Sequence, residues 1–247
     1  MDKLSKPINW KISRKNSFRR PVVAGHCLIL FLLCLLGGAT SVLAAPPVNG
    51  KGEANLPDSG HYTGQFKNGL FHGRGKITWR EGSYYIGEFY KGLMQGKGEF
   101  HYKNGEFYKG GFKDGLADGK GEYQYANGDH YQGDFVNGLP GGKGTYKGVG
   151  GYVYKGLFKN GYFHGNGTTQ LANGDRYIGE YEKGYEQGFG IYYYKNGDRY
   201  EGEFKSGLFH GRGKLTVNQT GEVITGQWRN GEFIEPKEGQ GEFFQEI

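Results

Sequence analysis

Aromatic residues and glycines alternate with polar residues along most of this chain, with a period of two. Tyr85, Gly87 and Phe89 fall on one face of an extended segment. In the next segment, Lys97 and Glu99 fall on the face opposite to that segment's aromatic residues. A period of two is typical of β-strands that bury one face. The pattern predicts strands with one aromatic face and one charged face.

The alternating segments recur as a longer unit. Each unit begins with Tyr-x-Gly and continues with an aromatic residue at the fifth place and glycines at the eighth, twelfth and fourteenth places. A fixed step of this length indicates a repeat architecture. The step is 23 residues, and the first tyrosines of the seven units are Tyr62, Tyr85, Tyr108, Tyr131, Tyr154, Tyr177 and Tyr200.

Asn-Gly pairs, the strongest short hairpin signal, occur in both halves of the unit, as at Asn68-Gly69 and Asn104-Gly105. Two turns per unit predict two strands per unit. Helices are disfavoured because 46 of the 49 glycines follow residue 44. The predicted fold is all-β: an elongated, single-layer antiparallel β-meander of some fourteen to sixteen strands, roughly 65 to 75 Å long at the usual strand spacing. We expect each tyrosine ring to lie over a glycine of a neighbouring strand.

From Tyr62 to Gly75 the chain resembles the MORN repeat family, whose pattern is Tyr-x-Gly-x-Phe-x-x-Gly followed by His-Gly-x-Gly. The resemblance implies a scaffold, a dimerisation module or a peptide-binding array. It places repeats over residues 62–231, starting at 62, 85, 108, 131, 154, 177, 200 and, in degenerate form, 224. Residues 232–247 are then expected to be a C-terminal cap, and the proline-containing residues 45–61 a linker.

The N-terminal segment, residues 1–44, has a different composition. Seven basic residues precede an apolar run from Val22 to Leu36, and small residues follow up to Ala44. This order is typical of a secretory signal with cleavage between Ala44 and Ala45. Residues 22–45 are also long enough for an uncleaved membrane anchor. Either way, we expect an exported chain that is periplasmic, extracellular or anchored to the membrane by its N-terminus.

Net charge gives no support to nucleic-acid binding. The whole chain has 31 Lys and Arg against 25 Asp and Glu, but residues 1–44 hold seven basic residues and one acidic residue, which leaves 24 of each in the remainder. Both cysteines, Cys27 and Cys34, lie in the apolar run, so the repeats have no disulfide.

No residue pattern indicates catalysis, a metal site or a cofactor. His72, His164 and His210 share the eleventh place of their repeats, which puts His164 and His210 two repeats apart and too distant for one metal ion. We expect these histidines to satisfy backbone groups in turns. The Gly-x-Gly pairs precede strands, so they lack the helix that a phosphate loop needs.

Two surfaces are candidates for binding a protein partner or a second copy. An apolar cluster replaces the usual polar residues of the sixth repeat: Ile178, Phe189, Ile191 and Tyr193. The other candidate is the aromatic face, represented by Tyr85, Phe89, Phe100, Tyr102, Tyr108, Phe112, Tyr123, Tyr125, Tyr131 and Phe135.

The sequence favours a non-enzymatic repeat scaffold of the cell envelope that binds a protein partner, or itself, through the aromatic face. Two alternatives remain open. One is a module that binds lipid or glycan at the membrane surface through its rings and turn lysines. The other is an accessory subunit of an envelope enzyme.

Overall fold

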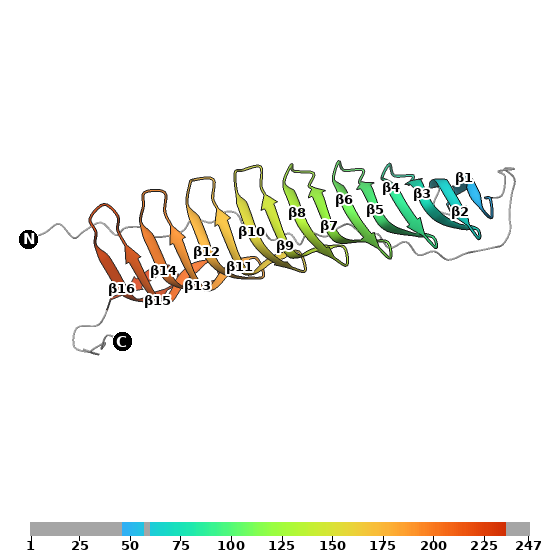
Figure 1. Cartoon of the computed structure of the whole chain (residues 1–247). Helices are drawn as coiled ribbons and strands as arrows, with labels where there is room; N and C mark the ends of the chain where they lie inside the picture. Colours follow the sequence, from blue (N-terminus) through green and yellow to red (C-terminus); the bar gives the residue numbers. More distant parts are fainter. Residues whose placement is uncertain (1–45, 57–59, 236–247) are drawn as a thin grey trace, which may run out of the picture. The chain divides into compact units, whose positions relative to one another are not determined.

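The computed structural model describes residues 46–56 and 60–235, which form two compact units, residues 46–162 and residues 163–235. Figure 1 shows strands joined in chain order by short turns in each unit. The described residues contain seventeen strands and no helix, and every strand pair within a unit is antiparallel. The predicted all-β antiparallel meander is confirmed. Consequently, no helix in the described ranges is long and apolar enough to cross a bilayer.

The strands follow the repeat, one in each half. The unit of residues 46–162 contains β1 (Gly50–Asn55), β2 (His61–Lys67), β3 (Leu70–Thr78), β4 (Tyr84–Tyr90), β5 (Leu93–His101), β6 (Phe107–Lys113), β7 (Leu116–Gln124), β8 (His130–Val136), β9 (Leu139–Lys147) and β10 (Val153–Lys159). The next strands are β11 (Tyr162–Gln170), which begins at the boundary, β12 (Arg176–Glu182), β13 (Tyr185–Tyr193), β14 (Arg199–Lys205), β15 (Leu208–Thr216), β16 (Val223–Arg229) and β17 (Glu232–Ile234).

Tight turns join the two strands of each repeat. Asn68 and Gly69 have φ angles of 54° and 73°, and the same left-handed pair recurs in every repeat, for example at Lys91 and Gly92 with 50° and 86°. Two successive positive φ angles define the type I′ hairpin turn, whose twist matches that of the strands. Strands of seven and nine residues then fit together through a bulge, as between Gly64 and Gln65.

One range differs from the prediction. Residues 45–61 were expected to be a linker, but they contain β1, which pairs with β2 from Gly50↔Phe66 to Asn55↔His61. Its residues Gly50-Lys51-Gly52-Glu53 match the second strand of a repeat without the aromatic residue that usually follows. Of the predicted cap, β17 is described, and residues 236–247 lie outside the described structure.

Glycine is required where the first tyrosine of each repeat lies. A Cβ atom added to Gly87 would lie 2.2 Å from Oη of Tyr85, and one added to Gly98, opposite Gly87 on the next strand, would lie 2.4 Å from the same oxygen. The phenol also donates a hydrogen bond of 3.0 Å to the carbonyl of Glu88. The ring therefore lies flat across a glycine pair, as expected.

The rings also pack against the following repeat. Tyr85 meets Phe112 edge to face at 4.9 Å, and Tyr108 meets Phe135 at 4.7 Å. Such edge-to-face pairs stabilise beyond the area they bury. Each repeat thus supplies part of the cover for its neighbour's tyrosine, and the core is a continuous row of rings along one face of each unit.

We expect Gly133→Val to lower the free energy of unfolding by about 1 to 3 kcal/mol, the usual range for overpacking. A Cβ at Gly133 would lie 2.5 Å from Cα of Gly144 and from Oη of Tyr131, and 2.6 Å from the carbonyl oxygen of Lys143. Two of these atoms are backbone, so the strands must shift. Chemical denaturation followed by circular dichroism measures the change.

Gly150→Val is the matched control, because a Cβ at Gly150 meets no atom within 4 Å. Its unfolding curve should stay close to that of the native chain. Equal curves for the two variants would show that the glycine pair is not under steric pressure.

Candidate interaction surfaces

The aromatic face is mostly closed by its own packing. Eight of the ten residues proposed to contact a partner expose between 0 and 7% of their surface: Tyr85, Phe89, Phe100, Tyr108, Phe112, Tyr123, Tyr131 and Phe135. Tyr102 and Tyr125 are half-buried. The expectation of an open row of rings is therefore corrected, because these side chains hold successive repeats together and leave little ring surface for a partner.

Burial keeps the phenols neutral. Desolvation raises the pKa of Tyr62 from 10.0 to about 12, against the weaker opposing effect of its hydrogen bonds with the backbone of His72 and Gln65. Burial likewise raises the pKa of Tyr85, Tyr108 and Tyr131. These phenols donate to the backbone carbonyls of residues three places further along the chain.

Buried carboxylates join one repeat to the next at the longer turns. Asp175 accepts hydrogen bonds from the phenol of Tyr192 at 2.8 Å, from the backbone N–H of Lys195 at 2.8 Å and from the side chain of Asn173 at 2.7 Å. Asp129 makes the equivalent contacts to Tyr146 and to the N–H of Val149. This role was not predicted from the sequence, because an aspartate in Asn-Gly-Asp is expected as an ordinary turn residue.

We expect the buried tyrosines to make each unit less stable above about pH 10. Where the folded pKa of a tyrosine is raised, unfolding releases protons once the pH exceeds the unfolded value of 10.0, so the contribution of that tyrosine to the free energy of unfolding is constant below that pH and falls as the pH rises toward 12. Phenolate absorbance and far-ultraviolet circular dichroism, recorded together against pH, should change in the same interval. Ionisation of all tyrosines near pH 10 with an unchanged β-spectrum would contradict this burial.

The predicted apolar cluster is present on the outer, charged face of the unit of residues 163–235. Ile178 and Ile191 are directly opposite each other on β12 and β13. Phe189 exposes 53% of its surface and Ile178 37%. Phe189 occupies the bulge position, where the other repeats carry Arg74, Lys97, Lys120, Lys143, Asn166 and Arg212.

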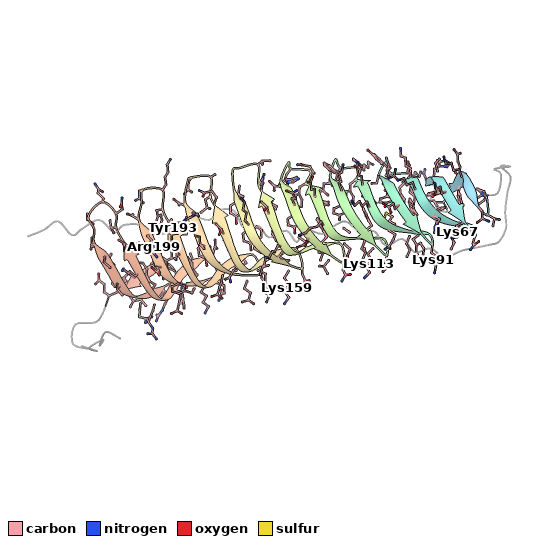
Figure 2. All side chains as sticks on the ribbon, viewed as in Figure 1. Lys67, Lys91, Lys113, Lys159, Tyr193 and Arg199 are labelled. Atoms are coloured by element: carbon pink, nitrogen blue, oxygen red, sulfur yellow. The ribbon has the colours of Figure 1, made fainter. Side chains whose placement is uncertain are left out.

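Two arginines flank the fourth member of this cluster. The guanidinium of Arg176 lies 4.7 Å from the ring centre of Tyr193 and that of Arg199 5.8 Å from it, and Arg199 also pairs with Glu201 at 2.6 Å. Figure 2 shows Tyr193 and Arg199 close together. The exposed side chain of Arg176 offers a cation beside an apolar surface.

The unit of residues 46–162 has a ladder of stacked rings on its outer face that was not predicted from the sequence. Tyr84 stacks on His101 at 4.4 Å, His101 stacks on Phe107 at 5.6 Å, and Lys76 lies 5.0 Å from the ring centre of Tyr84. These rings follow one another on β4, β5 and β6. Their shared position at the strand ends was the signal that could have identified them. Because they cover one another, the ladder stabilises the charged face.

The short turns of the same unit form an edge with alternating chemistry. Lys67, Lys113 and Lys159 occupy the position at which the intervening repeats have Tyr90 and Val136, and these two expose 52% and 54% of their surface. Figure 2 shows Lys67, Lys91, Lys113 and Lys159 along this edge. The edge combines cations with exposed apolar side chains.

The part of the chain that the structure describes contains no group of three or more His, Cys, Asp or Glu that could hold a metal ion. His72, His164 and His210 lie within β3, β11 and β15, not in turns as expected. Nδ1 of His210 is buried and has no hydrogen-bond partner. At the same repeat position, Gln95 and Gln187 accept backbone N–H groups.

Tyrosine over glycine, two strands per repeat and type I′ turns define an open β-repeat protein. The MORN repeat model matches residues 62–84, 85–107, 108–130, 131–151, 154–176, 177–199 and 200–216, more than half of the chain. The chain belongs to the MORN repeat family. No curated protein matches it.

Three matching solved structures show distant likeness. The SAS-4 (dCPAP) TCP domain of Drosophila melanogaster, in complex with a proline-rich motif of Ana2 (dSTIL), is 14% identical with a TM-score of 0.39, over 79% of this chain and 99% of that chain. A mutant TCP10 domain of Danio rerio CPAP is 13% identical with a TM-score of 0.24, over 71% and 99%. A virginiamycin B lyase of Staphylococcus aureus is 10% identical with a TM-score of 0.15, over 73% and 71%. At these scores the likenesses carry no conclusion about this chain.

Proposed function

We propose that this chain is a non-enzymatic repeat scaffold of the cell envelope that binds a protein partner through its outer-face cluster, Ile178, Phe189, Ile191 and Tyr193. The observation that carries the proposal is Phe189, a large apolar side chain that is 53% exposed at a position occupied by polar or charged residues in the other repeats. An exposed apolar patch rimmed by charge is characteristic of a protein interface.

The cluster fits a partner with a matching arrangement. The cross-strand pair of Ile178 and Ile191 provides a flat apolar floor beside Phe189, and Arg176 lies at its margin over Tyr193. A partner segment with an apolar side chain next to a carboxylate would fit this surface. Its apolar side chain would cover the pair of Ile178 and Ile191, and its carboxylate would form an ion pair with the guanidinium of Arg176. The aromatic face contributes rigidity, because its rings are occupied by contacts between repeats.

Replacing Phe189 and Ile191 together by lysine should weaken partner capture at least tenfold while the β-spectrum is retained. Both side chains point to the outer face, so the change removes apolar contact surface without opening the ring core. Partner proteins are captured from the exported fraction of cells that produce the protein. The captured partner is then purified and its dissociation constant measured by calorimetry.

Gln132→Lys with Thr145→Lys is the matched control, since these paired residues occupy the positions of Ile178 and Ile191 two repeats earlier, away from the cluster. It adds the same charge but removes no apolar group, and it should bind the partner like the native chain. Loss of folding in the Phe189 and Ile191 variant would show that the cluster is internal packing. Equal weakening by both variants would show a general charge effect.

The turn edge favours a second candidate function, binding to a lipid or glycan surface. Lysines that alternate with exposed apolar residues suit an anionic membrane surface. Sedimentation with phosphatidylserine vesicles separates this function from the scaffold. The scaffold predicts little binding, because residues 45–247 carry equal numbers of acidic and basic residues. Strong binding that is lost on changing Lys67, Lys113 and Lys159 to Gln would favour the lipid function.

Export is part of the proposal and rests on the N-terminal sequence. The signal or anchor of residues 1–44 and the cleavage point between Ala44 and Ala45 lie outside the described structure. N-terminal sequencing of the recovered protein distinguishes a chain that starts at Ala45 from a tethered one. Full-length protein that stays in the cytosol would contradict both forms, and would leave a role as an accessory subunit of an envelope enzyme without support.

A further inference from the structure

A column of glycines sets the register of every strand pair in the unit of residues 46–162. Gly52 lies opposite Gly64, Gly64 opposite Gly75, and Gly75 opposite Gly87. The column continues through the unit to Gly144 opposite Gly156. Residues on either side of each glycine point to the outer face, where neighbouring strands place their charges opposite one another.

The column starts at β1, which is half of a repeat. Gly50 has a φ of 95°, like Gly96 at the same repeat position with 72°. Asn49 accepts the N–H of Asn68 at 3.0 Å, as Gln95 accepts that of Asp114 at 3.1 Å. The other second strands, β3, β5, β7 and β9, have a strand on both sides, whereas β1 pairs with β2 alone among the described residues. Figure 1 shows β1 at the end of this unit's sheet.

The inner face of β1 is already closed. Where Tyr85 covers Gly98 within the array, the ring of Pro47 covers Gly52, because a Cβ added to Gly52 would lie 2.5 Å from Cγ of Pro47. A further Tyr-x-Gly strand would bring a tyrosine ring into the space that Pro47 fills. The edge therefore suits an added strand whose glycine is covered by a small side chain of the same strand's chain and not by a tyrosine ring.

We propose that β1 pairs antiparallel with β1 of a second copy of this chain, centred on Gly52. This register continues the glycine column from one copy into the other. Each copy contributes a Gly52 that is covered by Pro47 of the same copy. Lys51 then lies opposite Glu53 of the second copy, and the two-fold axis repeats the pair. Gly50 lies opposite Ala54 of the second copy, so small residues meet on the inner face. The contact is isologous and closes as a dimer.

The charges at this edge are available and follow a pattern already present in the sheet. Lys51 is exposed, and the Glu53 side chain is 66% exposed although its Oε2 lies 3.5 Å from Nε2 of His61. Within the unit, Lys109 and Glu99 are directly opposite across β5 and β6 with 2.8 Å between Nζ and Oε1, and Lys120 lies 2.6 Å from Asp134 across β7 and β8. The dimer would form the same kind of cross-strand pair twice, and would also satisfy the backbone groups of an open edge.

The test is a charge swap measured by sedimentation velocity over a range of concentrations, with the chain as recovered from cells. The native chain should show a monomer–dimer equilibrium that weakens with added salt. Lys51→Glu places acidic residues opposite each other twice and should weaken dimerisation about tenfold, as should Glu53→Lys. The double variant Lys51→Glu with Glu53→Lys exchanges the charges and should restore the dimer.

Lys155→Glu is the matched control, because it alters net charge equally at an exposed outer-face position away from β1. It should dimerise like the native chain. A native chain that stays monomeric, a double variant that fails to recover, or a dimer unaffected by all of these changes would each overturn the proposal. The pairing does not depend on the outer-face cluster, so its failure leaves the proposed partner binding untouched.

Discussion

The fold depends on one close contact, a tyrosine ring lying flat on two glycines of adjacent strands. Oη of Tyr131 would lie 2.5 Å from a Cβ at either Gly133 or Gly144. A side chain at either glycine would lift the ring and part the strands. The glycines cost backbone entropy, but they let the phenol reach the carbonyl of Asp134 at 2.8 Å, which gives the buried hydroxyl a partner. The sheet is therefore held together by rings on glycine and needs no covering layer of helices.

Contacts between repeats extend this local unit. The ring of Tyr131 meets Phe158 of the next repeat at 4.7 Å, and Asp129 links its own turn to Tyr146 and Val149 of the next repeat. Repeats stabilised through neighbours in this way add stability approximately one interface at a time. The same packing closes the aromatic face, and this is why the surfaces proposed for partners lie on the outer face, along the turns and at the open edge of β1.

The sequence predicted the repeats, the strands, the turns and the glycines under the rings, because each follows from periodicity and local geometry. It did not predict that the rings bury one another, since the contact of Tyr85 with Phe112 depends on the bulge and on the placement of the next repeat. β1 was missed because the prolines around it suggest a linker and Ala54 stands where an aromatic residue is usual. The apolar cluster was found from sequence because Phe189 and Ile191 break a pattern that other repeats keep.

Ring-current shifts in the NMR spectrum test the central contact most directly. If the ring of Tyr131 lies over Gly133 and Gly144, the α-protons of these glycines must resonate well upfield of ordinary glycine positions, and Tyr131→Leu must return them toward those positions. Gly150, which has no neighbour within 4 Å of a Cβ, provides the reference in the same spectrum. Ordinary α-proton shifts at Gly133 and Gly144 in the folded native chain would contradict the account.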